Sequence, residues 1–178
     1  MAVIVVGGSG KDAGKTSLVC GLLAALPELA WVAVKVTGHG HGKPQPIWEE
    51  TVPGSGTDTA RYLAAGASRA FLITARDEEL AAALQALRSM LAPDTNILFE
   101  SNRTPGHLHP DLCLAISRGE PMDDKPSFHA LAGAMDARVI PGQQDYFERG
   151  ATPVFSLVAL DRVSPEMQNW IRQQLARL

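Results

Sequence analysis

The stretch that decides the fold is Gly7-Gly8-Ser9-Gly10-Lys11-Asp12-Ala13-Gly14-Lys15-Thr16-Ser17. It follows a short β-branched run, Ala2 to Val6, and it opens an apolar helical pattern from Lys15 to about Leu26. In a strand–turn–helix of this kind, successive backbone N–H groups curve around phosphate oxygens at the N-terminus of the helix. Glycines let the backbone approach the anion because they have no Cβ. The stretch therefore predicts a phosphate-binding loop.

Two side chains at the end of this loop carry the chemistry expected of a P-loop. Lys15 would neutralise the β- and γ-phosphates of a nucleotide, and Thr16 would place its hydroxyl on Mg²⁺. The common pattern has a glycine five positions before Gly14, where this chain has Ser9 between two glycines. A glycine turn with a solvated lysine is the plainer alternative. The predicted nucleotide-binding residues are Gly8, Ser9, Gly10, Lys11, Asp12, Ala13, Gly14, Lys15, Thr16 and Ser17.

Short apolar runs alternate with helical patterns along the rest of the chain. Strands are expected at residues 31–36, 70–73, 96–99, 112–116, 138–140 and 154–158. Helices are expected at residues 57–65, 77–91 and 126–135, and a closing helix is capped by Ser164. Residues 37–56 have no clear period and predict a long loop. The alternation predicts a single domain over residues 1–178, with a mostly parallel sheet between two helical layers: the α/β, three-layer P-loop NTPase fold.

Ligands of such sheets bind beyond the carboxyl ends of the strands, and two charged residues stand there. Lys35, near the end of the second strand, would reach a transferred phosphate or an anionic substrate. Its alternative is an edge-strand lysine that points to water. Glu100 follows a buried strand and would hold the Mg²⁺ shell together with Thr16, directly or through water. The alternative for Glu100 is an exposed acid at a strand end.

Asp58 stands at the start of the short helix at residues 57–65. An acid there favours the helix dipole, and its place after the long loop also allows it to sense the γ-phosphate or Mg²⁺. With Lys15 and Lys35 it completes the predicted catalytic set. His39 and His41 lie two apart among glycines and predict a ligand loop that would bind a metal or steer an anion. A solvated loop is their alternative.

The composition narrows the classes of function. The chain has 178 residues, of which 46% are hydrophobic and 20% charged, so it is long enough for one domain with a real core and is unlike a disordered chain. Its net charge of −3 argues against nucleic acid as a partner. Two cysteines cannot form a disulfide framework and favour a cytoplasmic protein. No membrane-spanning segment and no secretory leader are expected.

Four segments, taken in order, resemble the MobB family, the molybdopterin-guanine dinucleotide biosynthesis accessory proteins. The segments are Gly8–Ser17, Val34–Gly42, Gly56–Ala67 and Ile97–Asn102. The resemblance implies Mg²⁺-dependent binding of GTP or ATP, with slow or partner-dependent hydrolysis. It also implies contact with molybdopterin or with a partner enzyme of molybdenum cofactor synthesis, and a homodimer. No Asn-Lys-x-Asp run, which common GTPases use to recognise guanine, occurs in the chain, so the base stays open.

The position of the loop glycine is closer to dethiobiotin synthetase, another member of the P-loop class. In that enzyme a threonine-rich loop precedes a lysine on the second strand, which Lys35 resembles, and an acid after a later strand, which Glu100 resembles. This second resemblance implies an ATP-dependent ligase or kinase. A third hypothesis is a non-hydrolysing adaptor or metal carrier that uses His39 and His41. Residues from Met122 onward match neither family clearly.

Overall fold

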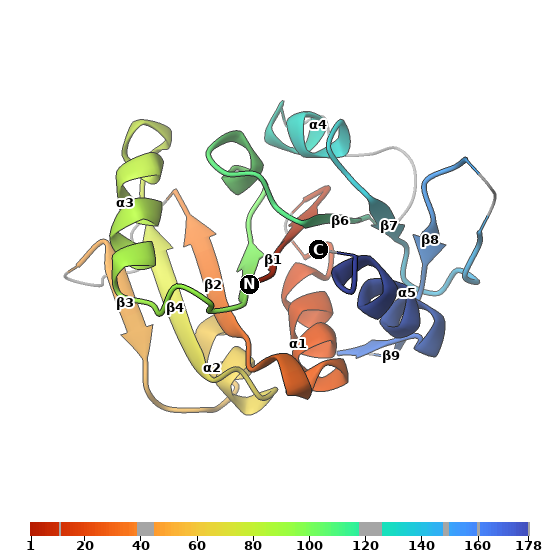
Figure 1. The fold of residues 1–178 in the computed structure, drawn as a ribbon, viewed down its shortest axis with the longest axis horizontal. Coiled ribbons are helices and arrows are strands. Elements are labelled where there is room, and N and C mark those ends of the chain that lie inside the picture. Colours follow the sequence, from red (N-terminus) through yellow and green to blue (C-terminus); the bar gives the residue numbers. More distant parts are fainter. Residues whose placement is uncertain (11, 39–44, 118–125, 148–149, 160, 178) are drawn as a thin grey trace.

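The computed structural model describes the chain except for residues 11, 39–44, 118–125, 148–149, 160 and 178. Within the described residues, eight strands form one sheet in the order β3-β4-β2-β5-β1-β6-β7-β8, and β9 and β10 form a separate pair (Figure 1). All neighbours in the large sheet are parallel except β3, which is antiparallel to β4. The predicted mostly parallel sheet is therefore confirmed.

The bounds of the elements follow the expected alternation of strand and helix. The first half contains β1 (Val3–Gly8), α1 (Lys15–Ala25), a 3₁₀ turn (Pro27–Leu29), β2 (Val32–Thr37), β3 (Ile47–Glu50), α2 (Asp58–Ala64), β4 (Arg69–Thr74) and α3 (Asp77–Ser89). The second half contains β5 (Ile97–Glu100), a 3₁₀ turn (Thr104–Gly106), β6 (Leu112–Ile116), α4 (Pro126–Ala132), β7 (Ala137–Val139), β8 (Val154–Phe155), β9 (Leu157–Ala159), β10 (Arg162–Val163) and α5 (Pro165–Leu175). Ser164 caps α5 as expected, because its hydroxyl accepts a hydrogen bond from the Met167 N–H.

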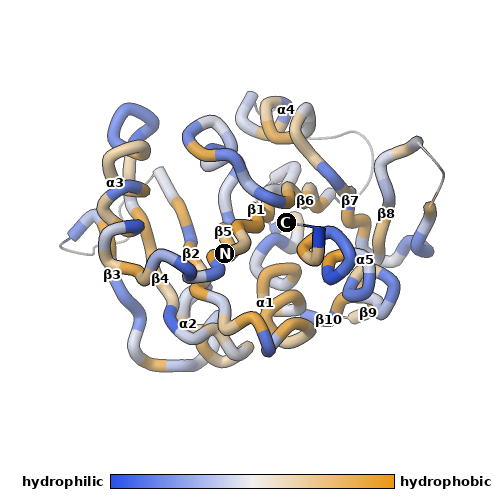
Figure 2. Tube along the Cα trace, in the orientation of Figure 1, coloured by the Kyte–Doolittle hydropathy of each residue, from blue (hydrophilic) through white to orange (hydrophobic). Residues whose placement is uncertain are grey.

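The two faces of the sheet carry separate cores. Alternate side chains of β1 divide between them, with Ile4 and Val6 on one side and Val5 on the other. The first core packs against α1, α2 and α5, and the second packs against α3 and α4. Figure 2 shows hydrophobic segments concentrated in the central strands and in α1. The arrangement is the predicted three-layer one, and it explains why the central strands read as unbroken apolar runs.

The order of the strands brings the candidate residues together. β5 lies between β1 and β2, and Glu100 at its end is in register with Val6 of β1 and with Lys35 of β2. The chain segments that follow β1, β2 and β5 therefore leave the sheet at the same edge. Lys35 belongs to an interior strand, so its alternative interpretation as an edge-strand lysine is wrong.

One expectation that the structure corrects is the long loop at residues 37–56. Ile47–Glu50 form an edge strand, β3, paired with β4. The sequence hides it because only four residues pair, two of them acidic, and all four are only partly buried. Arg69 of β4 holds this edge with hydrogen bonds of 2.6 and 2.8 Å to the two carboxylate oxygens of Glu49.

A second correction concerns the strand expected at residues 154–158. The chain is interrupted at Ser156, whose N–H donates to Asp145 Oδ1 at 2.6 Å instead of to a neighbouring strand. Residues before this point belong to β8 in the large sheet, and residues after it belong to β9, which pairs with β10. A side chain distant in sequence thus divides one apolar run into two strands.

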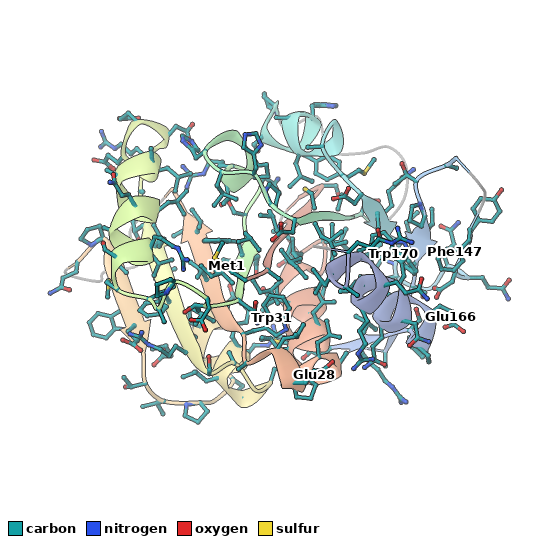
Figure 3. The ribbon with its side chains drawn as sticks, in the orientation of Figure 1. Met1, Glu28, Trp31, Phe147, Glu166 and Trp170 are labelled. Carbon is teal, nitrogen blue, oxygen red and sulfur yellow. The ribbon has the colours of Figure 1, made fainter. Side chains whose placement is uncertain are left out.

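Aromatic packing closes the end of the sheet formed by β8. The ring of Phe155 is 4.9 Å from that of Phe147 and 5.3 Å from that of Trp170 on α5, measured between centroids. Figure 3 shows Phe147 and Trp170 at this end of the molecule. Over the described part of the chain, no helix has the length and apolar character needed to cross a bilayer.

Candidate functional site

The turn between β1 and α1 has the geometry of a phosphate cradle. Gly14 stands at the N-cap of α1 with φ of 103°, a conformation that favours glycine. A Cβ at this position would also come within 3.0 Å of Ile116 Cδ1. Because Gly14 has no side chain, it gives the first N–H groups of α1 no side-chain cap. Such a helix N-terminus offers donors and a positive dipole to an anion.

Lys15 folds back over this turn. Its Nζ donates a 2.6 Å hydrogen bond to the carbonyl oxygen of Gly10. A Cβ on Gly8 would lie 2.7 Å from Lys15 Cγ, so the lysine stem crosses the loop where a larger residue would collide with it. This contact gives a physical reason for the glycine at position 8. Lys11 lies outside the described residues.

Asn102, just beyond β5, fixes the start of the loop. Its Oδ1 accepts a 2.8 Å hydrogen bond from the Gly8 N–H, and its Nδ2 donates one of 2.9 Å to the Gly8 carbonyl. The Ser9 N–H donates at 3.0 Å to the carbonyl of Ile116 at the end of β6. The loop is therefore tied to the strands on both sides of β1.

A second group of side chains gathers beside Thr16. We call it the Glu100 cluster, and it contains Thr16, Lys35, Asp58, Tyr62 and Glu100. Thr16 Oγ1 lies 2.9 Å from Glu100 Oε2 and 3.1 Å from Asp58 Oδ1. Lys35 Nζ forms ion pairs with Glu100 Oε1 and, at 3.0 Å, with Asp58 Oδ2. The hydroxyl of Tyr62 donates to Glu100 Oε2.

Four elements deliver these groups. Thr16 is the second residue of α1, and Glu100 and Lys35 come from neighbouring strands in register. Asp58 and Tyr62 lie four residues apart on α2, which places them on one face of that helix. The side chain of Thr57 begins α2 by accepting a 3.1 Å hydrogen bond from the Ala60 N–H. A single well-capped helix thus holds both residues toward Glu100.

Burial and charge set the protonation states within the cluster. Burial opposes the charge on Lys35, but the negative charge of Glu100 and that of Asp58 outweigh it and raise the pKa of the lysine. Burial likewise disfavours ionised Asp58, yet Lys35 prevails and lowers the pKa of that carboxyl. Burial, followed by the charge of Glu100, raises the pKa of Tyr62 well above its usual value. At neutral pH Lys35 is therefore charged, Asp58 ionised and Tyr62 a neutral donor.

The carboxylate oxygens of the cluster can accept more hydrogen bonds than its side chains can donate. Two carboxylates face one ammonium, and the single proton of the Thr16 hydroxyl cannot serve both of the carboxylate oxygens that it contacts. These are the hard oxygen ligands that Mg²⁺ prefers, and such sites commonly combine one or two carboxylates with substrate phosphates and water. The residues present therefore fit Mg²⁺. Among the described residues, no group of three or more His, Cys, Asp or Glu side chains gathers in the way a protein-only metal site requires.

The structure brings most of the predicted site residues into one place. Thr16, Lys35, Asp58 and Glu100 are joined by the contacts described above, and Lys15 precedes Thr16 at the start of α1. Glu100 is only 2% exposed, so its alternative as an exposed acid is wrong. The other residues of the loop are Ser9 and Gly10, Asp12 with φ of 61°, buried Ala13, and partly buried Ser17. His39 and His41 lie outside the described residues, and their ligand role stays a prediction.

Two residues of the site were not predicted from the sequence. Tyr62 is fully buried against Glu100, and Asn102 is bonded to the loop backbone. Tyr62 follows Asp58 by one helical turn, and Asn102 follows Glu100 by two positions. These spacings are signals only once α2 is known to face β5, and that orientation depends on the strand order rather than on any local pattern.

A cavity of about 580 Å³ lies away from the loop, between α1, α2 and the turn before β10. Its charged lining residues, Arg61 and Asp161, are paired with each other at 3.0 Å. Burial raises the pKa of Cys20, which also lines this cavity, to about 12, so its thiol is a poor nucleophile at neutral pH. The side chains suited to contact a phosphate or a cation lie in the loop and in the Glu100 cluster instead.

Comparison with solved structures supports this view of the fold. The chain is similar to LpxK from Aquifex aeolicus, solved in complex with ATP, with a TM-score of 0.55 and 22% identity over 88% of this chain. It spans about half of that protein, 53% of its length. At this identity the likeness shows the fold alone, which is the P-loop NTPase fold. No family model matches the chain, and no curated protein is significantly similar in sequence.

Proposed function

We propose that the chain binds a nucleoside triphosphate together with Mg²⁺. The triphosphate would lie on the loop at residues 8–17, and the cation would be held by Thr16, Asp58 and Glu100. The observation that carries this proposal is the position of Thr16. It follows the loop lysine directly and contacts both carboxylates at the edge where β1 and β5 end. A P-loop with no acidic partners would offer a phosphate site but no cation site.

The chemistry of such a site is positioning and charge neutralisation, with no covalent step by the protein. Lys15 would leave the Gly10 carbonyl and face the phosphate oxygens, while the N-terminus of α1 supplies backbone donors. Asp58 and Glu100 would orient the cation. Mg²⁺ held there would neutralise negative charge on the phosphates. ATP and GTP are both candidates, and ATP is the first to test because the structural neighbour was solved with it.

The order of the matched sequence segments supports a finer proposal: a MobB-like accessory NTPase. Its turnover would be slow or dependent on a partner, and it would act as a homodimer beside an enzyme of molybdenum cofactor synthesis. This role makes nucleotide binding, rather than rapid turnover, the primary event.

Lys35 favours a second candidate, an ATP-dependent ligase or kinase of the dethiobiotin synthetase type. Its ammonium contacts the proposed cation ligands from the interior strand β2. In that setting it would stabilise a transferring phosphoryl group or a carboxylated substrate. A nucleotide-gated adaptor with a metal on His39 and His41 is the third proposal.

Calorimetric titration with ATP, GTP and ADP, each with Mg²⁺ and with EDTA, tests the shared proposal. We expect saturable one-to-one binding of a triphosphate that Mg²⁺ strengthens. Absence of binding by every nucleotide would overturn it. Phosphate release then separates the candidates. Release without an acceptor supports the accessory NTPase, release only with a small carboxylate or amine supports the ligase or kinase, and no release with metal retained on purification supports the adaptor.

A further inference from the structure

The Lys35 ammonium lies between two of the side chains that are proposed to hold the cation, Asp58 and Glu100. Asp58 and Glu100 each contact both the Thr16 hydroxyl and the Lys35 ammonium. The four groups form a closed ring in which hydroxyl and ammonium alternate with carboxylates. The ammonium thus contacts two of the three groups proposed as Mg²⁺ ligands.

Charge balance explains why the ammonium is there. Two carboxylates that approach one hydroxyl this closely repel each other unless a positive charge lies near both. Lys35 is the described side chain that supplies this charge to both of them. Burial of Glu100 makes the need stronger, because a buried carboxylate without a partner is costly.

A second cation–carboxylate pair, Arg69 with Glu49, shows what an ordinary structural pair looks like. Arg69 meets the single carboxylate of Glu49 near the edge strand, and both side chains are more than one-third exposed. Lys35 differs in having two carboxylates and a hydroxyl in one ring. Its side chain is also a flexible four-carbon stem that ends in a point charge, so it can change partners without moving the strand.

On the basis of the nucleotide binding proposed above, we propose that Lys35 is an internal counter-ion that closes the cation site of the nucleotide-free protein. It leaves this position when a divalent cation and a triphosphate bind together, and its ammonium then faces the terminal phosphate. The triphosphate gives the displaced lysine a new anionic partner, so cation and nucleotide favour each other's binding. A divalent cation alone binds weakly because it has to compete with Lys35.

Binding of Mn²⁺ to the nucleotide-free protein, measured by EPR of the free ion, tests this proposal. Lys35→Met removes the competing charge and should bind Mn²⁺ about tenfold or more tightly than wild type. Lys35→Arg keeps the charge and should bind as weakly as wild type. Arg69→Met, which removes a cation from the ordinary pair, should leave Mn²⁺ binding unchanged. Equal Mn²⁺ affinity of Lys35→Met and wild type, or an equal gain in Lys35→Arg, overturns the proposal.

Loss of a buried partner is expected to destabilise Lys35→Met, so a second readout is needed. Mn²⁺ should raise the melting temperature of Lys35→Met more than that of wild type, because the metal replaces the missing charge. No greater rise in the variant would again overturn the proposal.

Repeating the EPR titration with ATP separates this proposal from nucleotide binding itself. In wild type, ATP should tighten Mn²⁺ binding. The difference in Mn²⁺ affinity between wild type and Lys35→Met should therefore be smaller with ATP than without it. If ATP binds wild type but the two proteins have equal Mn²⁺ affinity without ATP, the counter-ion proposal fails and nucleotide binding stands. If ATP binds neither protein but Lys35→Met still binds Mn²⁺ more tightly than wild type, nucleotide binding fails and the competition between Lys35 and the cation stands.

Discussion

The P-loop and the Glu100 cluster meet at Thr16 but are built in opposite ways. The loop is one contiguous turn that uses backbone groups, small residues and the charge of Lys15. The cluster draws side chains from four elements, and its bond between Thr16 and Glu100 spans 84 positions of sequence. The loop is proposed to bind phosphate, and the cluster is proposed to bind a cation. The proposed affinity for phosphate therefore depends on local sequence, whereas the proposed affinity for a cation depends on the topology of the sheet.

The largest effect is expected from a substitution of Lys15, which belongs to the loop and not to the Glu100 cluster. Lys15→Ala removes the charge expected on the phosphates, and we expect nucleotide affinity to fall about 100-fold, since a charge-assisted contact is worth about 3 kcal/mol. Calorimetry measures the affinity, and thermal unfolding checks that the variant is folded. Unchanged affinity in a folded variant would refute the phosphate role of Lys15.

A substitution of Asn102 should cause a smaller loss of nucleotide affinity. Asn96, at the other end of β5, offers a matched control. Asn102→Ala leaves the Gly8 N–H and carbonyl without their side-chain partner, and we expect about a tenfold loss of nucleotide affinity. Asn96 makes an equivalent pair of bonds, accepting from the Ala2 N–H and donating to the Leu29 carbonyl. Asn96→Ala should therefore destabilise the fold to a similar degree and leave nucleotide affinity intact. Equal losses of affinity in both variants would show that Asn102 acts only through stability.

Tyr62 tests the cluster rather than the loop. Tyr62→Phe removes one donor from Glu100, and we expect a severalfold weaker enhancement of ATP binding by Mg²⁺, since a hydrogen bond to a charged group is worth about 1.5 kcal/mol. Binding of ATP in EDTA should not change. Tyr146→Phe, at an exposed position near β8, is the control. A loss of ATP binding in EDTA would place Tyr62 in the packing of the loop instead.

The pH dependence of stability carries the smallest expected effect. Asp58 has a lowered pKa, so its contribution is present above pH 3.8 and is lost as the pH falls through the lower value of the folded state. Lys35 has a raised pKa, so its contribution is present below pH 10.5 and is lost as the pH rises through the higher value. Melting temperatures of Asp58→Asn should fall less than those of wild type in acid. The difference should be small because Asp58 is 41% exposed, and parallel acid profiles would contradict the ion pair.

The same contrast explains how far the sequence predicts this molecule. The glycine loop, α1 and the cap of α5 follow from local residue types, and they appear where expected. The division at Ser156 does not follow, because Asp145 causes it from eleven positions away. Edge strand β3 is hidden because its short acidic run gains strand character only by pairing with β4.

For the candidate site, the sequence predicts Lys15, Thr16, Lys35, Asp58 and Glu100 as separate residues with plausible alternatives. Their meeting depends on β5 lying between β1 and β2, which no local pattern specifies. The same strand order gives Tyr62 and Asn102 their contacts. Residues that act through long-range side-chain bonds are therefore the ones that sequence reasoning misses.

The most direct test of the account compares ATP binding with Mg²⁺ and with EDTA in wild type and Glu100→Gln. We propose that one site joins the phosphate loop to a cation held by the Glu100 cluster. Wild type should bind ATP about tenfold more tightly with Mg²⁺, whereas Glu100→Gln should bind equally with Mg²⁺ and with EDTA, at the EDTA affinity of wild type. Calorimetry measures all four affinities. An undiminished Mg²⁺ enhancement in folded Glu100→Gln would contradict the account.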